Sequence, residues 1–169
     1  MLTQLQNDFR EVMAGVATPV SVVTAFHEGA PHGTTVSAFT SLSMTPPMVL
    51  VSLDKTSRLL GLVRRSGRFG VNILGAAQAE TARSFAKKLE MGEKFAGITW
   101  EHDTGLPRIA GVPGWLACSV TQEVEGGDHI VLFGEVLSAA PATAAPLTYH
   151  SRTFGTHSLL DDRLCGQSA

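Results

Sequence analysis

The chain has 169 residues, the size of one domain, and we expect a single domain over residues 1–169. With 44% hydrophobic and 17% charged residues it can bury a core, so a long disordered region is not expected. A net charge of −2 argues against nucleic-acid binding, which usually requires a basic stripe. The first residues lack the apolar region of a signal peptide, and no apolar run approaches the ~18 residues of a membrane span.

The two cysteines, Cys118 and Cys165, form neither a disulfide framework nor a Cys-x-x-Cys motif. This usage fits a reducing compartment, so we expect a cytoplasmic protein that does not contact a membrane. The six histidines show no metal-ligand spacing with cysteines or carboxylates, and no metal is expected.

The N-terminal segment predicts an amphipathic helix, because its apolar residues recur at spacings of three and four. Thr3 and Gln6 can form a capping box at its start, and Gly15 ends it. A strand follows over residues 19–26, and residues 27–33 are expected to be a hairpin connection. The apolar positions of the helix are Leu2, Leu5, Phe9, Val12, Met13 and Val16.

The stretch from Gly33 to Arg58 organises the chain. Residues 34–41 are rich in hydroxyls but carry the β-branched and aromatic types of a strand. Residues 44–47 break the ladder with two prolines, and residues 48–53 predict a second, buried strand. The polar loop 54–58 then opens a helix, whose N-terminus attracts phosphate. This pattern suits an anionic, partly aromatic ligand, although an ordinary β-meander with turn residues also explains it.

The remaining elements are mostly strands. Helices are predicted over 57–66, which Gly67 ends, and over 76–88, with a strand at 68–74 between them. Residues 89–96 are mixed and expected to be a mobile loop, and 98–101 and 108–110 are weak strands. Two long strands, 115–123 and 129–138, are joined by a hairpin at 124–128; then follow a loop at 139–146 and a last strand at 147–154. About seven strands with few helices predict a mainly β fold, an antiparallel barrel that is closed or nearly closed.

Common catalytic motifs are missing from the sequence. It contains no G-x-G-x-x-G, no Walker-type G-K-[ST] and no H-E-x-x-H, and nothing reads as a Ser-His-Asp triad. A bound cofactor can supply the chemistry in such a protein, which leaves binding and orientation to the chain.

Four stretches in order carry a family resemblance: TVSAFTS at 35–41 with Pro46 and Pro47, VLVSLDKTSR at 49–58, FGVNIL at 69–74 with RSFA at 83–86, and GGDH at 126–129. The chain resembles the flavin reductase family of FMN-binding split barrels, the small reductase components of two-component flavin-dependent monooxygenases. The likeness runs from about residue 9 to 159, and we expect the tail 160–169 to be frayed.

The resemblance implies an antiparallel split β-barrel with a few helices that forms a homodimer. It implies FMN or FAD as the flavin, NADH as the favoured nicotinamide with NADPH as the alternative, and hydride transfer from nicotinamide C4 to flavin N5. Reduced flavin would pass to a partner monooxygenase. A non-catalytic flavin-binding protein of the same fold and a small-ligand module that has lost flavin are the alternatives from other classes.

The resemblance also assigns residues to roles. His129 is expected to act on the nicotinamide as the catalytic residue, with Tyr149 and Arg152 as further dinucleotide contacts. Structural readings stay open for several of these residues: Asp54 and Lys55 as a surface loop, Ser57 as a helix cap and Phe85 as core. Asn72 is either a flavin contact or a strand-end residue, Arg83 either a flavin contact or a helix-surface residue, and His32 is expected in a turn. The flavin residues implied are Thr35, Val36, Ser37 and Ala38 for the ring, Ser52, Asp54, Lys55 and Ser57 for the ring edge and ribityl phosphate, and Ser84, Phe85, Ala86 and Lys87 for the phosphate and adenine.

Overall fold

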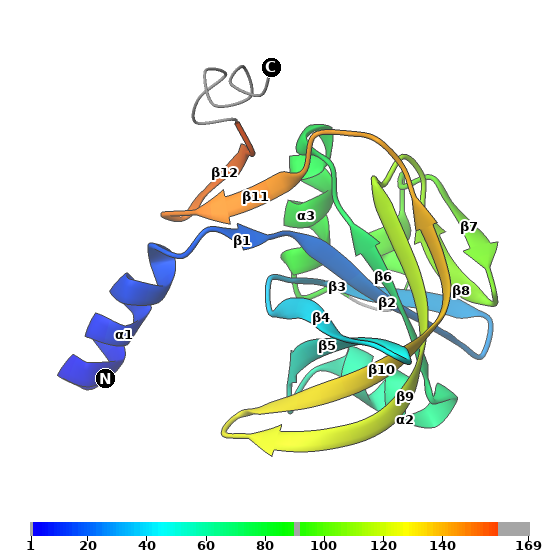
Figure 1. Ribbon diagram of the computed structural model, residues 1–169, viewed down its shortest axis with the longest axis horizontal. Helices are drawn as coiled ribbons and strands as arrows, with labels where there is room; N and C mark the ends of the chain where they lie inside the picture. The colour runs from blue at the N-terminus through cyan, green and yellow to red at the C-terminus, as the bar shows by residue number, and fades with distance from the viewer. Residues whose placement is uncertain (1, 90–91, 159–169) are drawn as a thin grey trace, which may run out of the picture.

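A computed structural model describes residues 2–89 and 92–158 (Figure 1). Its centre is a seven-stranded antiparallel sheet in the order β3-β2-β6-β9-β10-β5-β4. Two smaller sheets, β1-β11-β12 and β7-β8, accompany it. The strands of the large sheet are β2 (Ser21–His27), β3 (Ala30–Val36), β4 (Phe39–Met44), β5 (Pro47–Asp54), β6 (Arg68–Ile73), β9 (Gly114–Gly126) and β10 (His129–Pro141).

The two edge strands of this sheet, β3 and β4, are consecutive in the chain and are joined by Ser37 and Ala38 alone. The sheet therefore curls until its edges approach, and the carbonyl of Ala38 accepts a hydrogen bond from the Ser52 amide of β5 at 3.0 Å. This open, curled sheet is the expected split barrel. The prediction of one strand over 34–41 is wrong, because the chain crosses from one edge to the other at residues 37–38.

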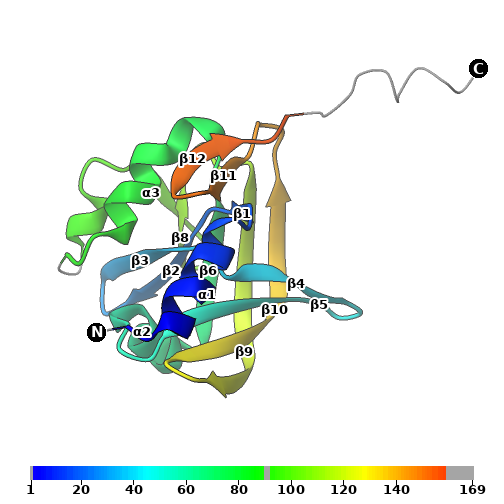
Figure 2. The same cartoon turned by 90° about the vertical axis from the view of Figure 1, so that its left-hand side faces the viewer.

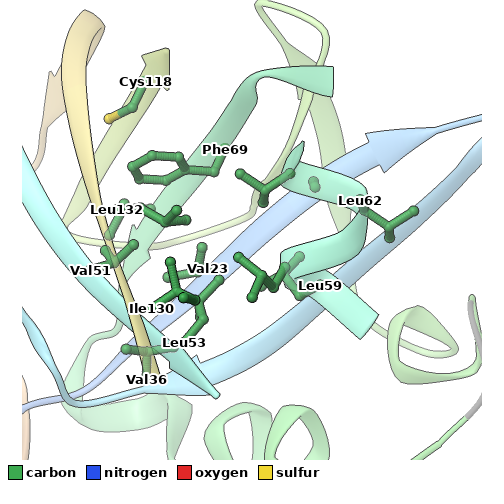
Figure 3. Close-up of a cluster of buried hydrophobic side chains, with 14 of the residues drawn as sticks. Val23, Val36, Val51, Leu53, Leu59, Leu62, Phe69, Cys118, Ile130 and Leu132 are labelled. Atoms are coloured by element: carbon green, nitrogen blue, oxygen red, sulfur yellow. The ribbon is translucent and has the colours of Figure 1, made fainter. Parts of the chain in front are cut away.

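The helix α2 (Arg58–Ser66) packs against the large sheet, where it buries Leu59, Leu60, Leu62 and Val63 in one core with strand side chains. Figure 3 shows Leu59 facing side chains from several strands of the sheet, whereas Leu62 lies on the other side of the helix. The helix ends as expected at Gly67, which has φ +67° and whose amide bonds the Val63 carbonyl. Such left-handed backbone suits glycine.

A second core lies under α3 (Ala79–Ala86), which follows the 3₁₀ turn η1 (Ala76–Gln78). Trp115, Phe85 and Phe95 dominate it. The side chain of Asn72 is fully buried there: its amide donates to the Val22 and Pro107 carbonyls, and its oxygen accepts from the Ile109 amide. Asn72 therefore ties β6 to β2 and to the small sheet of β7 (Trp100–Asp103) and β8 (Leu106–Ile109).

Other boundaries differ from the prediction. The hairpin after β2 needs only Glu28 and Gly29, both at positive φ, and β3 begins at Ala30. β10 continues to Pro141 because its last residues pair with the start of β9, so the predicted loop at 139–146 is shorter. The predicted strand 147–154 is two, β11 (Leu147–His150) and β12 (Thr153–Thr156), with a turn at positive φ between them.

The segment 89–96, expected to be a mobile loop, contains the 3₁₀ turn η2 (Glu93–Phe95), and Lys94 and Phe95 are buried in it. Aromatic packing holds it: the rings of Phe85 and Phe95 meet edge to face with centroids 4.8 Å apart. The predicted tail 160–169 and Cys165 lie outside the described residues.

The N-terminal helix α1 (Gln4–Ala14) stands beside the body of the molecule, next to β1 (Thr18–Pro19) and the β11–β12 hairpin (Figures 1 and 2). Its capping box is present as predicted, with Thr3 and Gln6 bonded reciprocally. None of its residues is buried, and Leu5, Phe9 and Val12 are 77%, 62% and 69% exposed. Its apolar face is therefore not covered by the part of the chain that the structure describes.

Candidate active site

A cavity of about 520 Å³ opens where the β3–β4 crossover, the end of β5 and the end of α3 meet. Ligand pockets usually have about 300–1,000 Å³. The cavity brings together ten of the fifteen side chains that the sequence singled out, from four separate parts of the chain. These ten are Thr35, Val36, Ser37, Ala38, Ser52, Asp54, Ser57, Ala86, Lys87 and His129.

The loop after β5 is shaped by Asp54. One oxygen of its carboxylate accepts from both the amide and the hydroxyl of Thr56, each at 2.6 Å. These hydrogen bonds, the hydroxyl first, lower the pKa of Asp54. The loop then enters α2 through Ser57, which occupies the N-cap position, but its hydroxyl makes no capping hydrogen bond. The expected cap is therefore incomplete, and Ser57 lines the cavity instead.

Lys55 is not among the cavity-lining residues. Its ammonium group lies 3.4 Å from a carboxylate oxygen of Glu125, on the neighbouring β9–β10 hairpin. Its backbone amide donates to the Asp128 carbonyl at 2.9 Å, which joins the loop to that hairpin. The backbone of Lys55 thus helps to hold the cavity rim, whereas its charge faces Glu125.

Some residues in and just after α3 pack in the core, and others line the cavity. The hydroxyl of Thr35 donates to the Ala82 carbonyl at 2.6 Å, which fixes α3 against β3. Phe85 is fully buried and lies in the core, beneath Gly33. Of the four α3 residues predicted from the sequence, only Ala86 and Lys87 line the cavity; Ser84 does not.

His129 begins β10 and lies opposite Asp54 in the β5–β10 ladder. Its Nδ1 atom is 2.7 Å from a carboxylate oxygen of Asp128. The side chain of His129 is 43% exposed, so the imidazole reaches both the cavity and solvent.

A second cavity of about 670 Å³ adjoins the first, with which it shares Thr35, Ser37 and Ala86. Tyr149 and Arg152, the expected dinucleotide contacts, line this second cavity. The guanidinium of Arg152 pairs with Glu11 of α1 at 2.5 Å, and Arg83 lies over the Phe154 ring, 5.1 Å from its centroid.

Eight of the residues that line this cavity are not among those predicted from the sequence, and two of the eight are buried polar side chains. His32, expected in a turn, is 4% exposed in β3, and Lys94, in the segment read as a loop, is 7% exposed. Neither has a periodic or motif signal, because each is buried by tertiary contacts with the rest of the chain. Arg58 and Lys88 also line the cavity.

Within residues 2–89 and 92–158, no three histidine, cysteine or acidic side chains gather where they could hold a metal ion. In the same residues, no helix has the length and apolarity needed to span a membrane. Cys118 is buried, and burial raises the pKa of its thiol to about 12, so it is unsuited to act as a nucleophile.

Comparison with known families and structures agrees with this fold. The family model of the flavin reductase like domain matches residues 13–158, and the chain therefore belongs to this family. It is 40% identical over 148 residues to the reductase component of a 4-nitrophenol 4-monooxygenase/4-nitrocatechol 2-monooxygenase from Rhodococcus opacus, covering 88% of this chain and 79% of that protein.

Solved structures share the architecture over nearly the whole chain. Component B of a nitrilotriacetate monooxygenase from Mycobacterium thermoresistibile superposes with a TM-score of 0.85 at 34% identity, covering 94% of each chain. The NADH:FAD oxidoreductase SgcE6 of Streptomyces globisporus, solved with NAD and FAD fragments, superposes with a TM-score of 0.87 at 29% identity and covers 96% of this chain and 99% of its own.

Proposed function

We propose that this protein is an NAD(P)H-dependent flavin reductase that supplies reduced flavin to a partner flavin-dependent monooxygenase. The observation that carries the proposal is the 520 Å³ cavity at the β3–β4 crossover, which gathers residues from four sequence stretches. The names of the similar proteins support it, because they include reductase components of monooxygenases and an NADH:FAD oxidoreductase. In this proposal residues 1–169 act as one domain.

The lining residues fit a flavin nucleotide. The crossover offers hydroxyl groups and exposed backbone to a polar ring, and the Nδ1 atom of His32 is buried without a hydrogen-bond partner. Three lysines favour a phosphate, while Asp54 is the one carboxylate that the described residues contribute to the lining. A bound flavin supplies the hydride-accepting ring atom, so the protein needs no nucleophile of its own.

The chain's own residues would bind the flavin and the nicotinamide dinucleotide and orient them. Residues 35–38 would hold the flavin ring at the crossover, and residues 86–87 would meet its phosphate end. The adjoining cavity beside Tyr149 and Arg152 would admit the nicotinamide dinucleotide, since the two cavities share Thr35 and Ser37. His129, held by Asp128, would orient the nicotinamide carboxamide. Holding the flavin ring and the nicotinamide ring close together and aligned would account for the rate of hydride transfer.

We further propose a homodimer in which α1 is covered by a second copy. An isolated helix of about 11 residues is marginal in water, and the apolar face of α1 packs on nothing within the described chain. Arg152 joins α1 to the rim of the second cavity through Glu11. A partner that covers α1 would therefore also border the proposed nicotinamide site.

NADH is the proposed donor with FMN or FAD as acceptor, in a reducing cytoplasm. The experiment is to purify the protein and to follow oxidation of NADH and of NADPH with FMN, FAD and riboflavin in turn. Rapid NADH oxidation that depends on both protein and flavin supports the reductase. Tight flavin binding without nicotinamide oxidation would favour the non-catalytic flavin-binding alternative, and absence of flavin binding would reject both.

A further inference from the structure

The floor of the first cavity contains a buried lysine that has no counter-ion among residues 2–89 and 92–158. Lys94 is 7% exposed, and its ammonium group donates to the Gly33 carbonyl at 3.1 Å and to the Phe85 carbonyl at 2.9 Å. No carboxylate of the described residues forms an ion pair with it. A lysine has three N–H donors, so one remains beyond these two bonds. Burial lowers the pKa of Lys94, which shows that the site penalises its charge.

His32 lies beside this lysine, since it precedes the glycine whose carbonyl Lys94 binds. The imidazole is 4% exposed, and its Nδ1 atom is buried without any hydrogen-bond partner. Burial, then the charges of Lys94 and Arg58, lower the pKa of His32 to about 4, so it is neutral at pH 7. Unsatisfied buried polar groups are uncommon and call for a partner.

Both side chains line the same cavity, at whose rim α2 begins without a side-chain cap. Lys87 and Lys88 add positive charge around it. In a chain with a net charge of −2, this concentration of cations favours an anionic ligand.

We propose that Lys94 and His32 form the floor of an anion subsite that binds the phosphate of the flavin nucleotide. Lys94 supplies its charge and third N–H, and neutral His32 supplies its Nδ1–H as a second donor. This inference rests on the proposed flavin reductase function and deepens it. It assigns the selection of phosphorylated flavins over riboflavin to two side chains outside the loop that contains Lys55.

A purely structural role of Lys94 is the competing explanation, because the same ammonium joins β3 to the end of α3. The two roles differ in what they do to riboflavin, which has the ring but no phosphate. Loss of structure weakens FMN and riboflavin together, whereas loss of an anion contact weakens FMN selectively.

The experiment measures dissociation constants for FMN and riboflavin on the whole protein, with the melting temperature of each variant. Lys94→Met should weaken FMN at least about tenfold, the scale of a charge-assisted hydrogen bond, and leave riboflavin within about threefold. His32→Leu, which removes no internal bond of Nδ1, should weaken FMN by a smaller factor in the same selective way. Lys55→Met is the matched control and should keep the wild-type ratio of the two constants.

Inorganic phosphate provides a second readout. It should compete with FMN on the wild-type protein and lose this effect in Lys94→Met, or in His32→Leu if the former does not fold. Equal losses for FMN and riboflavin in both variants, or selective loss in Lys55→Met alone, would overturn the subsite. A wild-type protein that binds riboflavin and FMN equally also overturns it while leaving the reductase standing; one that binds neither overturns the proposed function itself.

Discussion

The Nδ1 atom of His129 lies 2.7 Å from a carboxylate oxygen of Asp128, the residue immediately before it in the chain. Neighbouring strand residues usually point to opposite faces, but this pair lies at the turn where β9 passes into β10. The hydrogen bond to His129 lowers the pKa of Asp128, so the carboxylate is charged at neutral pH. Because the Asp128 carboxylate is hydrogen-bonded to Nδ1 of His129, the Nε2 atom of the imidazole is available to a ligand.

His129→Ala should therefore raise the KM for NADH and lower kcat, while the dissociation constant of the flavin changes little. Asp128→Asn should cause a smaller change of the same kind, because an amide orients the imidazole less strongly than a carboxylate. Steady-state kinetics with a separate flavin titration checks both. A collapse of flavin affinity with an unchanged KM for NADH would move His129 to the flavin site.

The buried His32 predicts how stability depends on pH in the flavin-free protein. Burial lowers the pKa of His32 from 6.5 to about 4. Between pH 4 and pH 6.5 this histidine is therefore protonated in the unfolded chain and neutral in the folded chain. Its contribution to the free energy of unfolding is thus complete above pH 6.5 and is lost as the pH falls towards 4, by about 3 kcal/mol in all.

Urea unfolding at a series of pH values should show a shallower decline in His32→Leu than in the wild type over this window. His157→Leu, at an exposed position, is the control and should keep the wild-type slope. If the wild type and His32→Leu declined in parallel, the burial of a neutral His32 would be contradicted.

Gly134 on β10 lies where the ring of Phe69, fully buried, leaves no room for a side chain. A methyl group at this position would collide with the ring and lie 3.1 Å from the Cβ atom of Cys118. Gly134→Ala should reduce the free energy of unfolding by about 1–3 kcal/mol. Gly126→Ala, where a methyl group meets nothing within 4 Å, is the control, and an equal loss in both would refute the packing argument.

The exposed apolar face of α1 predicts that two copies of the chain form a homodimer. Phe9→Glu puts a charge on that face and should convert the dimer into a monomer in light scattering at micromolar concentration. Asn7→Glu adds the same charge elsewhere on the helix and should leave the dimer intact. A wild-type protein that scatters as a single 17.9 kDa chain would disprove the homodimer.

Elements with a strong local signal could be predicted from the sequence. The capping box of Thr3 and Gln6, the end of α2 at Gly67 and the β9–β10 hairpin agree with the structure, because each depends on residues close together in the chain. Residues 139–141 fall in the predicted loop 139–146, but their pairing with β9, which is distant in the chain, makes them part of β10. Alanine and proline are poor strand formers, so the local sequence does not show this pairing.

The candidate site was predictable only in part. Residues 35–38, Ser52, Asp54 and Ser57 were singled out by their motifs and line the cavity, whereas Lys55 does not. Nothing local showed that the chain changes sheet edges at Ser37. Lys94 and His32 were missed for the same reason: a lysine in a polar segment and a histidine near a turn are read as exposed. Lys94 is held by the carbonyls of Gly33 and Phe85, next to His32, and only the tertiary fold brings these segments together.

The most direct test of the account is anaerobic flavin reduction by the wild type and by Ala38→Trp. Ala38 is exposed and lines the cavity, so an indole there fills the site without entering the core. The wild type should bleach oxidised flavin with one NADH consumed per flavin. Ala38→Trp should keep its melting temperature and lose most of this rate. If Ala38→Trp reduced flavin as fast as the wild type, or if the wild type left flavin oxidised in excess NADH, the assignment of flavin reduction to this cavity would be contradicted.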